Sequence, residues 1–470
     1  MKKLTFFAFI WAQISFGWGE VGHHLIARSA VEILKSHPSW TTAHLSALEQ
    51  ESFQSFFRVF KSKQYQQGHL SNIPDTYWRN LEHGMEEVGT LLGSSSHYLD
   101  SEKLLNLMNA KSFSQSKLPL TYAQAKNRFS SVKNFFKNIG SLPWRAQQFT
   151  DLYGSALTNH FSKVCNDDKN AELSTRVILT YAGLLSHYTG DVSMPYHSSV
   201  DHDAIAVGQK GIHSYFEQDL VAELEISNLF AKVTEKAHAL LNSPIPVDGT
   251  PSLESLRQRS KELYPTQLPN QETTALMMVV IEDSFSAIEK LRQLDYTYAI
   301  ANLEEALKQP SCRNLIVVKE LKNQYEKLDT DDQRAIFGKV KILSMPSDYH
   351  DKKTESACRR IPSERVNEDG ELSSTGKTVA EWHEAFIVNR LALSAILTAE
   401  IWVKEWLRTQ KPKLCSTYLY AHKPSFISPT ESKCFGYALK EAAKDLLMKN
   451  GKSALTGLNS SRSSFECLSF

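Results

Sequence analysis

The chain has 470 residues, of which 41% are hydrophobic and 22% charged, with 53 lysines and arginines against 52 aspartates and glutamates. This composition argues against a disordered or collagen-like chain, and the formal net charge of +1 argues against a protein that coats nucleic acid through its overall charge. It predicts a globular protein of one large domain or two to three smaller ones.

The first 17 residues have the pattern of a secretory signal peptide. Two lysines at positions 2 and 3 precede a mostly apolar run at 4–16, with small residues at Ser15 and Gly17. The alternative, a membrane anchor, needs about 20 apolar residues, which this run does not reach. We therefore expect cleavage before Trp18 and a secreted or periplasmic protein without a transmembrane anchor.

Apolar residues then recur mostly at helical spacing, and the alternation typical of strands is scarce. We expect an all-α fold in which the helices pack as a bundle. Loops rich in proline, serine, aspartate or glycine are expected at 244–251, 265–271 and 346–376. The expected helices are 21–34, 122–136, 173–188, 213–230, 275–291, 296–307, 379–407 and a short one near 437–448.

The cysteine content fits an exported protein. Six cysteines survive the expected cleavage, an even number that permits up to three disulfides in pairings that the sequence leaves open. None is spaced as Cys-x-x-Cys, so a thiolate zinc site or a redox pair is not expected. The cysteines are Cys165, Cys312, Cys358, Cys415, Cys434 and Cys467.

Histidine and carboxylate pairs concentrate in the first half of the chain. His187 and Asp191 are one helical turn apart, and Pro195 should end that helix so that His197 can turn back toward them. A second pair with the same spacing follows at His213 and Glu217. One such pair is usually a surface hydrogen bond, but two pairs within 31 residues, at 187–217, predict a metal site.

Imidazole and carboxylate ligands without a nearby thiolate suit catalytic zinc, which keeps one coordination position for water. Three histidines and two carboxylates are more than one tetrahedral ion needs. The excess predicts more than one metal ion, the usual arrangement for stabilising the attacking and leaving oxygens in phosphoester hydrolysis.

The segment 187–197, HYTGDVSMPYH, resembles the HYxGDxxxPxH signature of the zinc-dependent phospholipase C and single-strand-specific nuclease superfamily. The expected mature start, WGEVGH at 18–23, resembles the WGxxGH start of the nuclease branch. The resemblance extends over about 18–220. It implies an all-α phosphodiester hydrolase in which the first residue binds zinc through its free α-amine and carbonyl oxygen, so that cleavage before Trp18 would complete the site.

The resemblance also implies three zinc ions and a ligand set. Asp75 would double as the general base or water-orienting residue. The first ion would be bound by Asp75, His97, His187 and Asp191; the second by Trp18, His23 and the bridging Asp191; the third by His197, His213 and Glu217. The assignments of Asp75 and His97 rest on looser matches, namely the order of the ligands along the chain and a few neighbouring residues.

Other polar residues near these positions are expected to play no direct part. We expect His24 to lie on the helix surface or behind the ligands. His202, between Asp201 and Asp203, is expected to belong to a polar loop rather than to a metal site.

The branch within the superfamily decides the substrate. Residues 211–217, GIHSYFE, resemble the bacterial phospholipases, because an aromatic residue precedes Glu217 and the Gly-Gly-Asn element of the nucleases is absent before His213. Arg79 also lies four residues after Asp75, where the nucleases place an arginine at three. The balanced net charge also favours a phospholipase over a nuclease, because single-strand binders favour a basic groove. The WGxxGH start favours a nuclease.

We therefore expect a phospholipase C that acts on a phospholipid and contacts membranes peripherally. A single-strand-specific endonuclease with 5′-phosphate products is the alternative, and an inactive zinc-stabilised binding protein is a third possibility. Tyr77, Trp78 and Tyr98 could contact a choline headgroup or stack on a base, or belong to the core.

The resemblance to the superfamily also divides the chain. Residues 18–408 would form the catalytic domain, with a helical insertion at about 230–376 and a closing helix at about 378–408. Residues 409–470 would be a C-terminal extension whose role the sequence does not reveal.

Overall fold

The computed structural model describes residues 18–42, parts of 50–75, 94–113, 118–163, 168–204, 212–265, 268, 271–301 and 375–409. This part of the chain is mostly helical and contains two isolated β-bridges but no strand, which confirms the all-α prediction. The expected signal peptide, all six cysteines, residues 302–374 of the expected insertion and the tail after Thr409 lie outside the described residues, as do Tyr77, Trp78 and Arg79.

The described elements, in chain order, are α1 (Glu20–Ile33), η1 (Leu34–Ser36), α2 (Ser39–Thr42), η4 (Leu70–Asn72), η7 (Ser94–Ser96), α5 (Ser101–Leu107), α6 (Tyr122–Arg128), α7 (Phe135–Ile139), α8 (Leu142–Lys163), α9 (Asp168–Ser193), η9 (Pro195–Ser198), α10 (Ile212–Ser214), η11 (Tyr215–Asp219), α11 (Leu220–Glu223), α12 (Ile226–Asn242), α13 (Leu253–Leu263), α14 (Glu272–Ala301) and α19 (Val379–Arg408).

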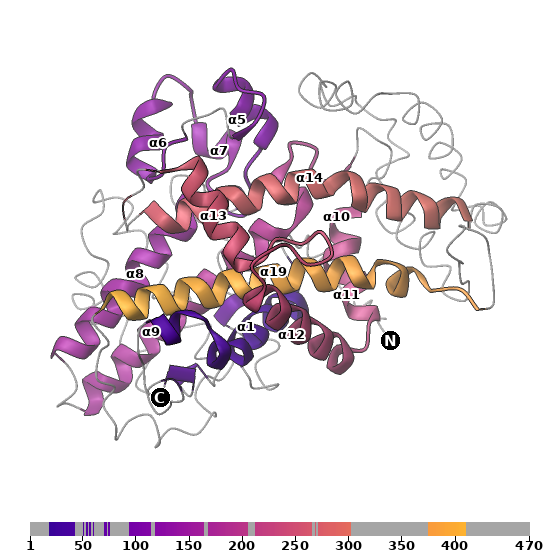
Figure 1. Cartoon of the computed structure of the whole chain (residues 1–470). Coiled ribbons are helices and arrows are strands. Elements are labelled where there is room, and N and C mark those ends of the chain that lie inside the picture. The colour runs from indigo at the N-terminus through magenta and orange to yellow at the C-terminus, as the bar shows by residue number, and fades with distance from the viewer. Residues whose placement is uncertain are drawn as a thin grey trace, which may run out of the picture.

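Four long helices form the body of the described part of the chain. Helices α8 and α9 pack side by side, and α19 packs against α1, α9 and α12. Helix α14 covers α8, α9 and η9. Figure 1 shows α19 in orange running through the middle of the molecule, with α14 above it and α1 and α12 below it. The C-terminal end of α9 is thus surrounded by α1, α14 and α19, and this arrangement positions the site described below.

Helix α19 is the central core helix. Among the described residues it alone is long and apolar enough to cross a membrane, but 94% of its most apolar window is buried inside the protein. Its Trp402 stacks on Phe57 with ring centroids 4.5 Å apart, and its Trp406 meets Phe53 edge to face at 4.4 Å. Such contacts contribute about 0.5–1.5 kcal/mol each beyond the area that they bury.

Several helices begin where their sequence supplies a cap. Thr378 accepts a hydrogen bond from the backbone of Glu381, whose side chain accepts one from the backbone of Thr378, so α19 begins with a capping box. Thr121 and Gln124 start α6 in the same way. Each cap satisfies backbone N–H groups that the first helical turn leaves without a partner.

The expected helices differ from the observed ones where the backbone turns. The helix expected at 122–136 is interrupted between α6 and α7, because Asn134 adopts a left-handed conformation with φ 55°. The helix expected at 213–230 is interrupted before α12, where Glu225 is extended and its carboxylate caps the next helix. The expected helices at 275–291 and 296–307 form one continuous helix, α14, as far as Ala301. Helices α5, α8 and α13 were not expected.

Candidate metal centre

All nine residues expected to bind metal lie in the described part of the chain. Eight of their side chains form three neighbouring groups, in each of which the ligand atoms lie within 4.8 Å of one another. The groups are His23, Asp75 and His187; His97, His187 and Asp191; and His197, His213 and Glu217. The ninth residue, Trp18, lies two residues before the start of α1.

Different elements supply these side chains. Helix α1 carries His23, the C-terminal part of α9 carries His187 and Asp191, and His97 follows η7. Helix α9 ends at Ser193, before Pro195, and His197 lies in the 3-10 turn η9 that follows, as the proline predicted. His213 and Glu217 lie on α10 and the π-helical turn η11, a wide turn that is frequent at functional sites.

Asp191 lies at the centre of the site. Its fully buried carboxylate has one oxygen, Oδ2, 2.9 Å from Nδ1 of His97 and 3.2 Å from Nε2 of His187. The other oxygen, Oδ1, lies 3.5 Å from Nε2 of His23 and 3.6 Å from Nδ1 of His197. One carboxylate therefore faces four histidines, the position that a bridging ligand requires.

The orientation of His187 is fixed from behind. Its Nδ1 lies 2.6 Å from the carbonyl oxygen of Ser71, which can only accept a hydrogen bond, so Nδ1 carries the proton. Nε2 then presents a lone pair toward Asp191. A backbone carbonyl bound to the far nitrogen is the usual support for a metal-binding histidine.

The group of His97, His187 and Asp191 fits a metal ion better than a set of hydrogen bonds. Nε2 of His187 is 3.1 Å from Nδ1 of His97, so the three ligand atoms form a nearly equal-sided triangle. A proton on Nδ1 of His97 can be donated toward both Nε2 of His187 and Oδ2 of Asp191. These two atoms are both acceptors, so no hydrogen bond can form between them. Ligand atoms at zinc distances lie ~3.3 Å apart in a tetrahedron, so one ion would satisfy all three.

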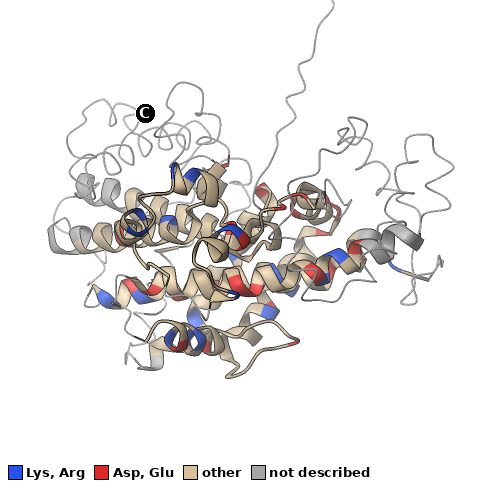
Figure 2. Ribbon diagram, turned by 90° about the horizontal axis from the view of Figure 1, so that it is seen from above, with Lys and Arg blue, Asp and Glu red and all other residues tan. Residues whose placement is uncertain are grey.

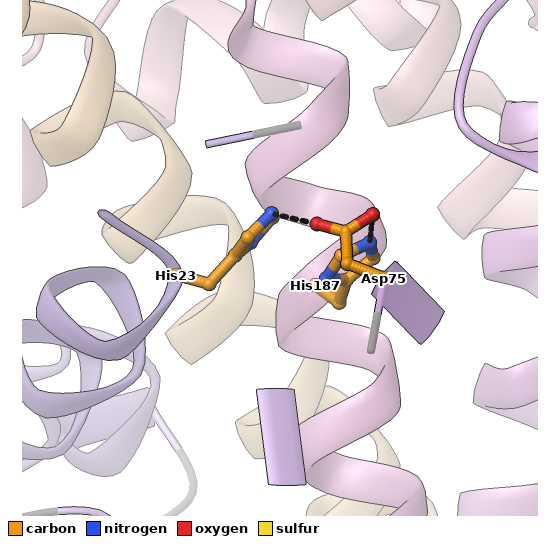
Figure 3. A group of neighbouring side chains, drawn as sticks. All are labelled: His23, Asp75 and His187. Carbon is orange, nitrogen blue, oxygen red and sulfur yellow. Dashed lines mark ion pairs between the residues drawn. The ribbon is translucent and has the colours of Figure 1, made fainter. Parts of the chain in front are cut away.

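Asp75 joins His23 and His187 at the edge of the centre (Figure 3). Its Oδ2 lies 3.8 Å from Nε2 of His23 and its Oδ1 lies 3.8 Å from Nε2 of His187. The two imidazole rings are stacked, with centroids 3.9 Å apart. The side chain of Asp75 is 12% exposed, whereas those of His23 and His187 are fully buried, so Asp75 lies nearest to solvent in this group.

The third group centres on Glu217. Its Oε1 lies 2.5 Å from Nε2 of His213 and 3.2 Å from Nε2 of His197. Burial, together with the neighbouring His213 and His97, holds the pKa of His197 well below its ordinary value. His197 is therefore neutral at neutral pH, the form in which imidazole binds a metal.

Trp18 is packed into the same region. Its indole is fully buried, and the indole N–H lies 3.1 Å from the carbonyl oxygen of Gly190, beside Asp191. Its neighbour Gly19 donates a backbone hydrogen bond to the carbonyl of Glu217 at 3.4 Å. The start of the expected mature chain therefore lies against Gly190, the residue before Asp191, and against Glu217.

Gly190 allows α1 and α9 to approach closely. A Cβ atom on this residue would lie 2.7 Å from Nδ1 of His23, a distance that requires the ring to move. The glycine in the HYTGD segment is thus required by the packing of His23 against the helix that carries Asp191.

The residues expected to lie outside the metal groups do so. Of the two positions expected for His24, the structure excludes the helix surface, since His24 is 2% exposed, and burial with the nearby Arg28 lowers its pKa to about 4. His202 lies 3.1 Å from Asp100 and belongs to none of the three groups. Burial alone would lower the pKa of His202, but the bond to Asp100 outweighs it and raises the pKa.

Tyr98 is the one expected aromatic residue that the structure describes. Its ring lies 4.6 Å from that of His202, and its hydroxyl donates to the carbonyl of Lys137 at 3.1 Å. The residues that sequence analysis missed are those that support the ligands, such as Ser71, which acts through its backbone and carries no signal in its side chain.

Comparison with known proteins adds no relative. No protein-family model, no curated protein and no solved structure matches the chain. What the site can do must therefore be derived from its geometry and from its sequence motifs.

Proposed function

We propose that this protein is a secreted zinc-dependent phosphodiester hydrolase with the helical fold of the phospholipase C and nuclease superfamily, and that it acts as a phospholipase C. The observation that carries the proposal is the carboxylate of Asp191, which lies within 3.6 Å of nitrogens of four histidines. Nitrogen and oxygen ligands of this kind favour catalytic zinc over calcium or magnesium, which prefer oxygen alone.

The nine residues divide among three ions in the proposed holoenzyme as the superfamily pattern implies, with Trp18 binding through its backbone. When bound, zinc lowers the pKa of a coordinated water to about 7 and neutralises charge on the phosphoryl oxygens. The carboxylates of Asp75, Asp191 and Glu217 contribute −3 against +6 from three such ions, leaving a positive site for a phosphodiester anion.

The protein residues have distinct roles in this proposal. Asp75, the most exposed of the three carboxylates, orients the attacking water or accepts its proton at Oδ1 or Oδ2. Asp191 and Glu217, whose side chains are fully buried, hold the histidines in place and exclude water from the inner part of the site. The stacked rings of His23 and His187 keep Asp75 between two imidazole nitrogens.

A phospholipid substrate is favoured over a nucleic acid by charge as well as by the GIHSYFE segment. Figure 2 shows lysines and arginines interspersed with aspartates and glutamates along the described helices. A single-strand nuclease needs a basic groove that follows the backbone of its substrate. The second candidate, a single-strand-specific endonuclease, is supported by the WGEVGH segment at 18–23 and by the burial of Trp18 beside Asp191.

The test is a parallel assay of the protein beginning at Trp18 on phosphatidylcholine vesicles and on single-stranded DNA, with zinc and after its removal by a chelator. We expect zinc-dependent release of phosphocholine. Zinc-dependent cleavage of DNA alone would identify the nuclease. Cleavage of neither substrate, with a melting temperature that still rises on zinc binding, would identify a zinc-stabilised binding protein and contradict the hydrolase proposal.

A further inference from the structure

The C-terminal end of α9, which carries Asp191, is fixed by donors from other parts of the fold. The last carbonyl groups of an α-helix have no partner within the helix, so each needs a donor from elsewhere. The carbonyl of Gly190 accepts from the indole of Trp18 at 3.1 Å, and that of Asp191 accepts from the backbone of Met194 at 3.0 Å.

The next two carbonyls accept from two other helices. The carbonyl of Val192 accepts from the hydroxyl of Ser284 on α14 at 2.6 Å, and that of Ser193 accepts from Nε of Arg390 on α19 at 2.7 Å. The side chain of Ser193 also contacts Ser394 on α19. The hydroxyl of Ser193 donates in addition to the carbonyl of Gly190 at 2.9 Å. Every carbonyl from Gly190 to Ser193 thus has a donor, and two of these donors, Ser284 and Arg390, lie on the helices that flank α9.

The side chain of Arg390 contacts both the end of α9 and helix α14. It is 4% exposed, and besides Ser193 it donates from Nη2 to the hydroxyl of Ser284 and pairs through Nη1 with Asp283. A positive charge at a helix C-terminus is stabilised by the helix dipole. Burying a guanidinium nevertheless carries a desolvation cost, which an apolar side chain at this position would not have.

The carboxylate of Asp191 must be positioned accurately if its two oxygens are to face the ring nitrogens of four histidines at once. Its Oδ2 meets two ring nitrogens at 2.9 and 3.2 Å and its Oδ1 meets two others at 3.5 and 3.6 Å. Metal–ligand distances tolerate only about 0.2 Å of error. A small rotation of the last turn of α9 would move both oxygens away from some of the histidines.

We propose that Arg390 is a positioning residue for the metal centre: by fixing the carbonyl of Ser193 and orienting Ser284, it fixes the last turn of α9 and therefore the carboxylate of Asp191. The proposal rests on the metal-binding part of the proposed function. It does not depend on which phosphodiester is cleaved.

The test compares Arg390→Lys with Arg257→Lys. Arg257 is a matched control, because it also reaches α19 through a carboxylate, pairing with Glu400 at 2.9 and 2.7 Å, but takes no part in the metal groups. Both changes keep the charge and lose the forked geometry of arginine. Ser284→Ala is a milder second variant that removes the donor to Val192 and leaves Arg390 in place.

Cobalt(II) replaces zinc as a probe whose visible spectrum reports its ligand geometry. In the full-length mature protein, we expect Arg390→Lys and Ser284→Ala to weaken cobalt binding about tenfold and to change the spectrum, as for other residues that support metal ligands. Arg257→Lys should lower the melting temperature and leave cobalt affinity and spectrum unchanged.

Wild-type cobalt affinity and spectrum in both Arg390→Lys and Ser284→Ala would overturn the positioning role. If Arg390→Lys does not fold, Ser284→Ala decides alone, and an unchanged affinity overturns the proposal. Failure of the wild-type protein to bind cobalt would overturn the metal centre itself. Tight wild-type binding without hydrolysis of any diester would refute the hydrolase and leave the comparison of variants intact.

Discussion

Nδ1 of His97 lies 2.9 Å from Oδ2 of Asp191, although 94 residues separate the two along the chain. His97 follows η7 and Asp191 lies in the last turn of α9, so the contact depends on the packing of the whole domain rather than on local spacing. A buried carboxylate that faces a ring nitrogen from a distant segment, and three further histidines, is the feature on which the proposed metal chemistry depends.

Asp191→Asn should remove the bridging ligand with little change in volume. Loss of a residue that merely supports a ligand costs about 10–100-fold in metal affinity or activity, so loss of this carboxylate should cost more than about a hundredfold in hydrolysis. The measurement is zinc content together with the hydrolysis rate. The control is Asp248→Asn on the exposed loop after α12, and equal activity of the two variants would contradict the role of Asp191.

Gly190→Ala should impair the centre without removing any ligand. Alanine is favoured over glycine within a helix by about 1 kcal/mol, but here the new methyl group would lie 2.7 Å from Nδ1 of His23 and displace that ring. We expect about a tenfold loss of zinc affinity in a chelator competition. Gly154→Ala, which meets only the flexible end of Glu405 and Arg408, is the matched control and should bind zinc normally.

The N-terminal residue provides a third test. In the proposed holoenzyme the α-amine of Trp18 binds zinc, and an amide nitrogen at the same position is a poor ligand. The protein beginning at Gly17 should therefore bind one zinc ion fewer than the protein beginning at Trp18, as measured by metal analysis after dialysis. Equal zinc content in the two forms would show that the α-amine takes no part.

The buried carboxyl group of Glu405 should make the free energy of unfolding depend on pH, independently of the metal. Burial raises its pKa from 4.5 to about 7, opposed by Arg408. The folded protein then binds more protons than the unfolded chain between about pH 4.5 and 7, so the free energy of unfolding decreases as pH rises through this range. Glu405→Gln removes this penalty and should stabilise the protein by on the order of 2–3 kcal/mol at pH 8, and little at pH 4.5.

Urea unfolding of Glu405→Gln at both pH values measures this effect. The control is Glu262→Gln, whose side chain is 51% exposed and which should have little effect at either pH. A stability gain for Glu405→Gln that is the same at pH 4.5 and pH 8 would show that titration of Glu405 is not its cause.

The sequence predicts much of this arrangement where the signal is local. The one-turn spacing of His187 and Asp191 and the proline before His197 correctly predict a helix that ends and a histidine that turns back. The breaks before Phe135 and Ile226 were missed, because they depend on a left-handed asparagine and on a carboxylate cap rather than on hydrophobic periodicity.

The residues that hold the ligands in place could not be predicted from the sequence. The bond of His187 to the carbonyl of Ser71 and that of Arg390 to the carbonyl of Ser193 join residues 116 and 197 positions apart. Every residue has a backbone carbonyl, so the residue type does not reveal which carbonyl supports a ligand. An arginine within a long apolar helix predicts only that its side chain needs some partner. Such contacts are set by how helices pack after the helices themselves are specified.

Anomalous diffraction near the zinc absorption edge, from crystals of the mature protein grown with zinc, tests the central claim most directly. We predict zinc peaks within about 2.0–2.2 Å of Nδ1 of His97, Nε2 of His187 and an oxygen of Asp191, and at the group of His213 and Glu217. Zinc-supplied crystals without anomalous peaks at these atoms would contradict the account, because the histidines and carboxylates would then bind one another instead of a metal.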